Sequence, residues 1–130
     1  MISQKARAAH LRLGRRGERV AARLLKTKGF EILSRDWRRG SGELDIVARD
    51  GAMLVFVEVK TKRAGSRSRP MENLSRAQIS RIRRGAVKYI ASVGLDHETF
   101  YRFDLVEVVL SRWRANAVYH HEYCYRAGGR

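Results

Sequence analysis

With 130 residues the chain is long enough for one domain with its own hydrophobic core, and it contains a single cysteine, Cys124. That count excludes an intrachain disulfide framework and a cysteine-rich zinc site. No apolar stretch approaches the length of a membrane span, and the N-terminal residues lack the apolar segment of a secretory signal. We therefore expect a cytoplasmic protein with no membrane partner. The Arg-rich, acid-poor start leaves an organellar transit peptide as a minor alternative.

The charge balance is strongly basic. Lysine and arginine number 28 against 13 aspartates and glutamates, which gives a formal net charge of +15, and 22 of the 28 are arginines. Arginine's planar guanidinium matches phosphate oxygens better than lysine does. The basic residues are spread over several predicted elements rather than along one amphipathic helix. Nucleic acid is therefore favoured as the partner, with an anionic membrane surface and ribosomal RNA as the alternatives.

The N-terminal region predicts a helix. Residues 1–10 have no clear pattern and are expected to be loose, whereas residues 11–28 are helical in periodicity. Gly29 follows as a natural stop signal. The residues expected on the inner face of the helix are Leu11, Gly14, Glu18, Ala21, Ala22 and Leu25.

Three strands are expected next. Residues 30–35 predict a short strand that Trp37 continues as an extended edge, and residues 38–42 predict a turn. A strand at 43–49 and another at 52–62 flank Asp50-Gly51, which is typical of a two-residue hairpin turn.

The C-terminal half predicts a helix and two strands. Residues 63–72 form a basic loop, and Ser75 with Gln78 makes a capping box for a helix that ends near Val93. Strands are expected at 101–110 and 115–125, and residues 126–130 are expected to be loose. The core of the second helix is expected to consist of Ile79, Ile82, Ala86, Ile90 and Val93. The whole predicts a single α/β domain, a five-stranded mixed sheet with a helix on each face.

Charged residues interrupt the apolar pattern of the second and third strands. With Asp50-Gly51 as the turn, Asp45 lies opposite Phe56 and Glu43 opposite Glu58. Glu43, Asp45, Glu58 and Lys60 then share one face of the sheet, provided that the loop has an even number of residues.

Such a cluster predicts a cation. Neighbouring acids destabilise a sheet, and carboxylate oxygens without cysteine or paired histidine favour Mg²⁺ or Mn²⁺. Glu18 sits in the apolar stripe of the first helix between small residues, so a close helix–sheet contact would add a further carboxylate. The plain alternative is a solvated strand end at Glu58 and Lys60 and a Glu18 outside the cluster.

The residues also carry a resemblance. GELDIVARDGAMLVFVEVKTK resembles the D…E-x-K core of the restriction-endonuclease-like PD-(D/E)XK superfamily. Several segments together make the chain similar to the YraN-like family of small bacterial endonuclease-like proteins: GRRGERVAARLLKTKGFEIL, DWRRGSGELDIVARD, FVEVKTKR, NLSRAQISRIRRGAVKYI and YRFDLVEV. This likeness covers about residues 14–110. It implies a restriction-endonuclease-like core similar to that of archaeal Holliday-junction resolvases.

The resemblance also implies roles. Asp45 and Glu58 match the acids that bind the metal, with the backbone carbonyl of Val59 as a further ligand. Lys60 matches the lysine that orients the attacking water, and Glu18 matches the acid on the helix of the resolvase branch. Leu44 stands where the superfamily pattern has proline. Gln78 is similar to a glutamine on the following helix of some nucleases, but the rest of that motif is absent.

Other side chains are candidates for binding. We expect phosphate contacts from Arg38, Arg39, Arg63, Arg67, Arg76, Arg81, Arg84 and Lys88. His120 and His121 are expected on opposite faces of a strand, so they cannot share a metal. Trp37, Trp113 and Tyr119 are expected to pack in the core or at its edge rather than to stack on bases.

These features predict a metal-dependent nuclease that cuts phosphodiester bonds in branched or nicked DNA, with Mg²⁺ or Mn²⁺ as cofactor and DNA favoured over RNA. Cutting two strands needs two sites, which is compatible with a homodimer. The competing hypothesis is a non-catalytic nucleic-acid-binding protein that keeps a nuclease-like fold, and a ribosome-associated basic protein is a third.

Overall fold

The computed structural model describes residues 3–66, 74–95 and 99–125, and the side chains of these residues as far as 122. Arg67, the side chain of Cys124 and residues 126–130 lie outside that part of the chain. The elements are α1 (Gln4–Thr27), β1 (Glu31–Arg39), β2 (Gly42–Asp50), β3 (Met53–Arg63), α2 (Arg76–Ser92), β4 (Tyr101–Leu110) and β5 (Ala115–Tyr125).

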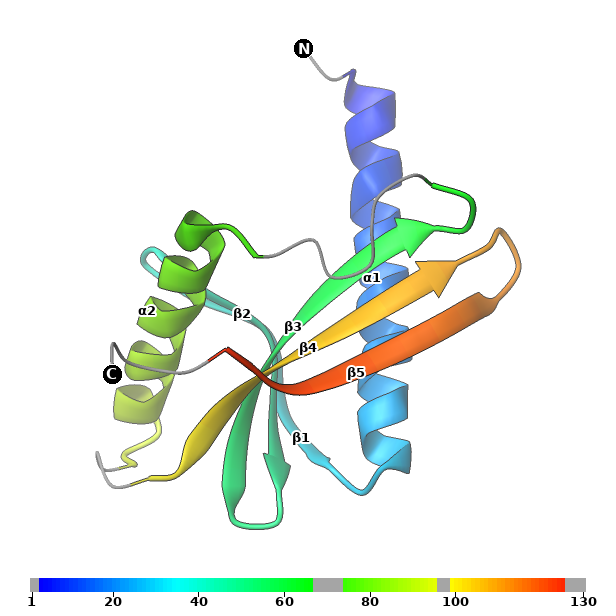
Figure 1. The fold of residues 1–130 in the computed structure, drawn as a ribbon. Coiled ribbons are helices and arrows are strands. Elements are labelled where there is room, and N and C mark those ends of the chain that lie inside the picture. The colour runs from blue at the N-terminus through cyan, green and yellow to red at the C-terminus, as the bar shows by residue number, and fades with distance from the viewer. Residues whose placement is uncertain (1–2, 67–73, 96–98, 126–130) are drawn as a thin grey trace.

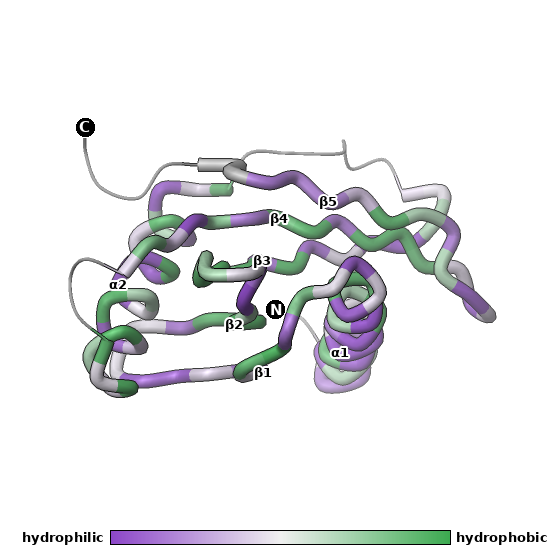
Figure 2. The backbone as a smooth tube through the Cα atoms, turned by 90° about the horizontal axis from the view of Figure 1, so that it is seen from below, coloured by the Kyte–Doolittle hydropathy of each residue, from purple (hydrophilic) through white to green (hydrophobic). Residues whose placement is uncertain are grey.

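The five strands form one mixed sheet in the order β1-β2-β3-β4-β5. β3 and β4 run parallel and are joined through α2, whereas the other neighbours are antiparallel. Figures 1 and 2 show α1 on one side of the sheet and α2 on the other. The predicted α/β fold, a five-stranded mixed sheet flanked by helices, is confirmed, and it is consistent with a restriction-endonuclease-like core.

Each helix covers its own hydrophobic core. Under α1, Ala21, Ala22 and Leu25 pack on apolar residues of β2, β3 and β4. Under α2, Ile82 and Tyr89 pack on the opposite face of the sheet. None of the helices in the described ranges is long and apolar enough to cross a membrane.

The first helix begins earlier than its periodicity predicts. Ser3 caps it by accepting a hydrogen bond from the amide of Ala6 at 3.1 Å, so residues 4–10 are helical rather than loose. Leu11 is 54% exposed and not part of the core. The reason is that the first turns of α1 extend past the sheet (Figure 1).

The turns between the first strands also differ from expectation. β1 continues to Arg39, so Arg38 and Arg39 belong to a strand rather than to a turn. In the next hairpin Asp50 pairs with Met53, and the two turn residues are Gly51 and Ala52. Each β2 residue therefore pairs two positions further along β3 than predicted. The loop still has an even number of residues, so the shift does not change which residues of the two strands point to the same face of the sheet.

The second helix begins as predicted. Ser75 and Gln78 form a complete capping box, with hydrogen bonds of 3.1 and 2.8 Å. Val93, expected in the core, is 49% exposed because the helix ends before it, and Tyr89 is the buried residue near the C-terminal end instead. Trp37 lies edge-on to Tyr89, with ring centroids 5.5 Å apart, which confirms its packing role.

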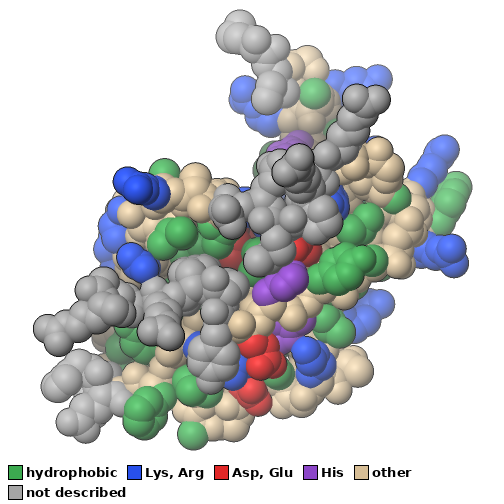
Figure 3. Space-filling view, in the orientation of Figure 1, with side chains coloured by type: hydrophobic (Ala, Val, Ile, Leu, Met, Phe, Trp, Pro, Cys, Tyr) green, Lys and Arg blue, Asp and Glu red, His purple; other side chains and the backbone are tan. Residues whose placement is uncertain are grey.

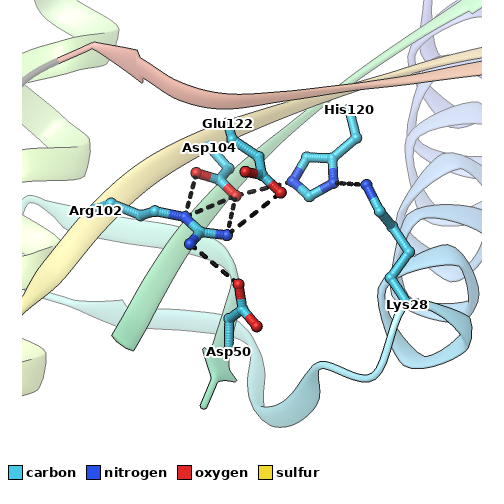
Figure 4. A network of polar contacts seen from close by, with 6 residues as sticks. All are labelled: Lys28, Asp50, Arg102, Asp104, His120 and Glu122. Atoms are coloured by element: carbon cyan, nitrogen blue, oxygen red, sulfur yellow. Dashed lines mark hydrogen bonds and ion pairs between the residues drawn. The ribbon is translucent and has the colours of Figure 1, made fainter. Parts of the chain in front are cut away.

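A buried polar network lies between β4, β5 and the C-terminal end of α1 (Figure 4). Arg102 donates to both carboxylate oxygens of Asp104 and, at 3.1 Å, to Asp50. His120 contacts Asp104 through Nε2 at 2.8 Å and the Lys28 ammonium through Nδ1 at 2.7 Å. Since the ammonium can only donate, Nδ1 accepts and Nε2–H donates to Asp104. The network joins three strands to the end of the first helix.

The two neighbouring histidines face opposite sides of the sheet. His121 contacts Glu107 through Nε2 at 2.9 Å, while His120 contacts Asp104. The prediction that they do not share a ligand is confirmed.

Candidate active site

A cavity of about 380 Å³ lies between the sheet and the N-terminal parts of both helices. All four residues predicted to be catalytic line it: Glu18 from α1, Asp45 from β2, and Glu58 and Lys60 from β3. Val59, the predicted backbone ligand, lines it as well. The side chains lining the cavity that carry charge or hydrogen-bonding groups are His10, Glu18, Glu43, Asp45, Glu58, Lys60, Thr61, Gln78 and Arg81.

The cavity opens where the β2–β3 hairpin comes apart. The last backbone pair of that ladder joins Ile46 to Val57, and Asp45 and Glu58 are the next residues on the two strands. There the Asp45 carboxylate, not a backbone carbonyl, accepts the amide hydrogen of Val59, with Oδ2 at 2.9 Å from the nitrogen. The separation of the strands thus brings the two acids together at the edge of the core.

Asp45 and Glu58 hydrogen-bond to each other. Glu58 is only 8% exposed. Burial, and after it the charge of Asp45, raises the pKa of Glu58 to about 8, although Lys60 and Arg81 act in the opposite direction. Burial also raises the pKa of Asp45, while the Val59 amide opposes that shift. The raised pKa values mean that the pair keeps a proton more readily than two isolated carboxyls would.

Glu18 approaches this pair from the helix. Its pKa is raised to about 7, first by burial and then by the charges of Asp45 and Asp36. Gly17 makes the approach close, because a Cβ at that position would collide with the side chain of Thr61 on β3. An added Cβ on Gly14 would meet nothing within 4 Å. Of the two glycines in α1, Gly17 rather than Gly14 is thus the one that lies against the sheet.

Glu43 differs from the other acids in the cavity. Its Oε1 lies 3.3 Å from Nη2 of Arg38, and its Oε2 lies 3.4 Å from Nε of Arg81. These two arginines balance its charge. The Arg81 contact is an ion pair, and among the described residues its buried Nε has no acceptor with hydrogen-bond geometry.

The other predicted phosphate contacts are distributed over the surface. Arg76 and Arg84 are exposed on α2, and Arg63 is exposed at the end of β3. Arg39 stacks on Trp37 at 5.7 Å, and its carbonyl accepts from the ammonium of Lys88 at 3.2 Å. Of this set only Arg81 lines the cavity itself.

Sequence reasoning missed two neighbours of the acids. His10 lines the cavity although it precedes the predicted helix. Asp36 lines an adjoining cavity together with Glu18, and its φ of 49° is unusual for a residue other than glycine. No sequence signal distinguishes Asp36 from an ordinary strand residue, because a left-handed aspartate is visible only in coordinates.

The donor set suits a hard divalent ion. In the described ranges no three His, Cys, Asp or Glu side chains are arranged as a complete metal cage. Mg²⁺ is usually held by only one or two protein carboxylates and completes its shell with water and substrate phosphates. Two adjacent carboxyls, one buried and one half-buried, whose pKa values are both raised meet that description. Asp45 and Glu58 therefore fit such an ion.

Comparison with known proteins identifies the family. The profile of the Uncharacterised protein family UPF0102 matches residues 17–108, a span that includes Glu18, Asp45, Glu58 and Lys60. The chain belongs to this family. The resemblance to YraN-like proteins drawn from the sequence is confirmed by this match.

Bacterial members of UPF0102 align over most of their length. A UPF0102 protein of Beutenbergia cavernae is 44% identical over 108 residues, which cover 83% of this chain and 91% of the relative. One from Streptomyces coelicolor is 44% identical over 109 residues, covering 83% and 84%. One from Symbiobacterium thermophilum is 43% identical over 97 residues, covering 75% and 81%.

Proposed function

We propose that this UPF0102 protein is a metal-dependent nuclease that hydrolyses phosphodiester bonds in DNA, with Mg²⁺ or Mn²⁺ as cofactor. The observation that carries the proposal is the interacting pair of carboxyls, the buried Glu58 and the half-buried Asp45, in a cavity that also contains Lys60. Burying two acids side by side is costly unless a cation is present. A purely structural role would be better served by apolar residues.

Each side chain has a role that follows from its chemistry. Asp45 and Glu58 would hold the ion, with the Val59 carbonyl beside them. When bound there, the ion would supply positive charge that polarises the phosphate and makes water more acidic. Lys60 would orient the attacking water and exchange a proton with it. Glu18 has a pKa of about 7, so near neutral pH it can accept or release a proton.

Arginines would hold the substrate. Arg81 lines the cavity, so its guanidinium is suited to a phosphate oxygen next to the cut. Arg38, Arg63, Arg76 and Arg84 would contact phosphates further away. DNA is proposed over RNA, in the cytoplasm, and a symmetric dimer would supply the two sites that a two-strand cut requires.

The test is nicking of supercoiled plasmid. We expect Mg²⁺-dependent nicking by the wild-type protein, none in EDTA, and none with Asp45→Asn. Lys60→Ala should slow nicking by roughly 100-fold or more, as expected for loss of a proton-transfer group. Lys26→Ala removes an equal charge from the exposed last turn of α1 and should leave the rate unchanged.

Two results would contradict the proposal. Nicking that persists in both Asp45→Asn and Lys60→Ala would mean that the reaction is not catalysed at this site. Absence of nicking with either metal, together with DNA gel shifts that EDTA does not change, would favour the non-catalytic binding protein. The shared proton gives that alternative some support, since it lets the acid pair exist without a metal.

A further inference from the structure

A second cavity of about 600 Å³ adjoins the candidate active site. It contains three arginines from three different elements: Arg16 of α1, Arg63 at the end of β3, and Arg112 in the turn between β4 and β5. None of the described residues that line it is acidic. A concave site that offers several guanidinium groups and no carboxylate favours an anion with oxygen acceptors, and phosphate fits best.

One of the three arginines is held in place by the surrounding backbone. Arg16 donates from Nη2 to the carbonyl of Ser111 at 3.1 Å, which fixes α1 to the β4–β5 turn. The turn is itself closed by the amide of Ser111, which donates to the carbonyl of Arg114 at 2.8 Å, and by the Ser111 hydroxyl, which bonds the Arg114 backbone. The cavity wall is therefore an ordered element rather than an irregular loop.

The same turn presents an exposed aromatic side chain. Trp113 is 84% exposed, with the Arg112 guanidinium 5.1 Å from its ring. The sequence-based expectation that Trp113 packs in the core is thus wrong. Where Figure 1 draws this turn, Figure 3 shows hydrophobic atoms flanked by basic side chains. A large ring held in water by an ordered turn is suited to stacking on a flat ligand.

The two cavities are neighbours along strand β3. Leu13 lines both of them, and β3 contributes Lys60 and Thr61 to the first and Arg63 to the second. Three residues of a strand span about 10 Å. A ligand that contacts both cavities and Trp113 therefore needs several phosphates along a chain and also aromatic rings.

We infer that the arginine cavity and Trp113 form a subsite for the unpaired flank of the nucleic-acid substrate, an inference that rests on the proposed function. Arg16, Arg63 and Arg112 hold phosphates further along the strand from the cut, and one base stacks on Trp113. In a continuous duplex both faces of every base are covered by its neighbours. The subsite therefore selects nucleic acid with a free base, such as a single strand, a gap or an end.

The test uses Trp113 as its own reporter. The chain has two tryptophans, so Trp37→Phe leaves Trp113 as the sole tryptophan emitter. In EDTA, a short oligothymidylate should quench that emission. Trp113→Ala should weaken binding of this single strand by about 5- to 150-fold, whereas Trp113→Phe should keep most of the affinity. Binding of relaxed, covalently closed duplex should be unchanged in both variants.

The arginines are tested by the salt dependence of binding. Arg63→Ala and Arg112→Ala should each lower the slope of log affinity against log salt for the single strand by about 0.7. Arg23→Ala, an exposed arginine of α1 that lines neither cavity, is the matched control and should leave the slope unchanged.

Several outcomes would overturn the inference. The inference is wrong if Trp113 fluorescence does not change when the oligonucleotide is added. It is also wrong if Trp113→Ala weakens binding of the closed duplex as much as binding of the single strand. A blue shift on anionic vesicles without a response to oligonucleotide would assign the turn to a membrane surface. A change of sedimentation coefficient with Trp113→Ala would assign it to contact between copies of the chain.

The outcome is independent of cleavage, because binding is measured in EDTA. If plasmid nicking fails while single-strand binding depends on Trp113, the proposed nuclease falls and the subsite stands. If nicking depends on Asp45 while Trp113→Ala changes nothing, the subsite falls and the nuclease stands.

Discussion

At the scale of single residues, the charged end of β3 has a physical explanation. Val57 and the residues before it are core residues, whereas Glu58 follows at the point where β2 leaves β3. Asp45 arrives there from the neighbouring strand and shares a proton with Glu58. The fold thus keeps two acids close together and out of water, at a cost that a bound cation would offset.

The raised pKa of Glu58 makes the stability of the metal-free protein depend on pH. The pKa of Glu58 is raised from 4.5 to about 8, so between these values the folded state binds more protons than the unfolded state. Stability should therefore be complete at low pH and be lost as pH rises through this window, by about 1–3 kcal/mol. Thermal unfolding in EDTA from pH 5 to pH 8 measures the loss.

The variant Glu58→Gln should make this dependence shallower, because it removes one titrating group, while Glu18, whose pKa is raised to about 7, still titrates in the same window. Glu31→Gln, which changes an exposed carboxyl of β1, should keep the wild-type dependence. An equally steep loss in Glu58→Gln would mean that the acid pair does not control the pH response.

At the scale of elements, the contact of α1 with β3 positions Glu18. Gly17→Ala should push the helix away from Thr61, because the new methyl group has no room. We expect a loss of roughly 1–3 kcal/mol, typical of overpacking, and slower plasmid nicking in the folded protein. Chemical denaturation and the nicking assay together check this prediction.

Gly14→Ala is the matched control on the same helix. An added methyl there meets nothing within 4 Å, and alanine favours helix over glycine by about 1 kcal/mol. This variant should be at least as stable as the wild type. Equal effects of the two substitutions would contradict the role assigned to the Gly17 contact.

Alternation and capping signals predicted every helix and strand, because these patterns are local. The hairpin turn moved by one residue because Asp50 is held in the strand by Arg102 of β4, a contact between residues far apart in sequence. The face shared by Asp45, Glu58 and Lys60 was predictable since it depends only on an even loop length.

Side-chain pairing could not be predicted in the same way. Glu43 belongs to the same strand pattern as Asp45, yet two arginines from β1 and α2 balance its charge. Trp113 has a large apolar side chain of the kind usually found in a core, but it is exposed in a hydrogen-bonded four-residue turn. Both outcomes depend on the packing of distant elements, which local periodicity does not contain.

At the scale of the whole molecule, the buried network around Arg102 ties the sheet to the end of α1. Arg102→Met should remove the guanidinium that pairs with the fully buried Asp104 and cost roughly 3–5 kcal/mol. Urea denaturation measures the loss. The double variant Arg102→Met with Asp104→Leu should recover part of it, since both charges are then gone. A loss below about 1 kcal/mol in the single variant would mean that the network contributes little.

The molecule carries a formal net charge of +15. On the face drawn in Figure 3, basic side chains lie mainly around the rim, and acidic side chains appear in small groups between them. The rim would attract a polyanion, whereas the acids of the cavity would repel the phosphate at the cut. A divalent ion bound between Asp45 and Glu58 would turn that repulsion into attraction.

The most direct test of this account is a calorimetric titration with Mn²⁺ near neutral pH. The wild-type protein should bind one ion per chain and release about one proton, because Glu58 must lose its proton to become a ligand. Asp45→Asn and Glu58→Gln should each abolish the response. Binding that is absent from the wild type, or that is unchanged in both variants, would contradict a cation site between these two strands.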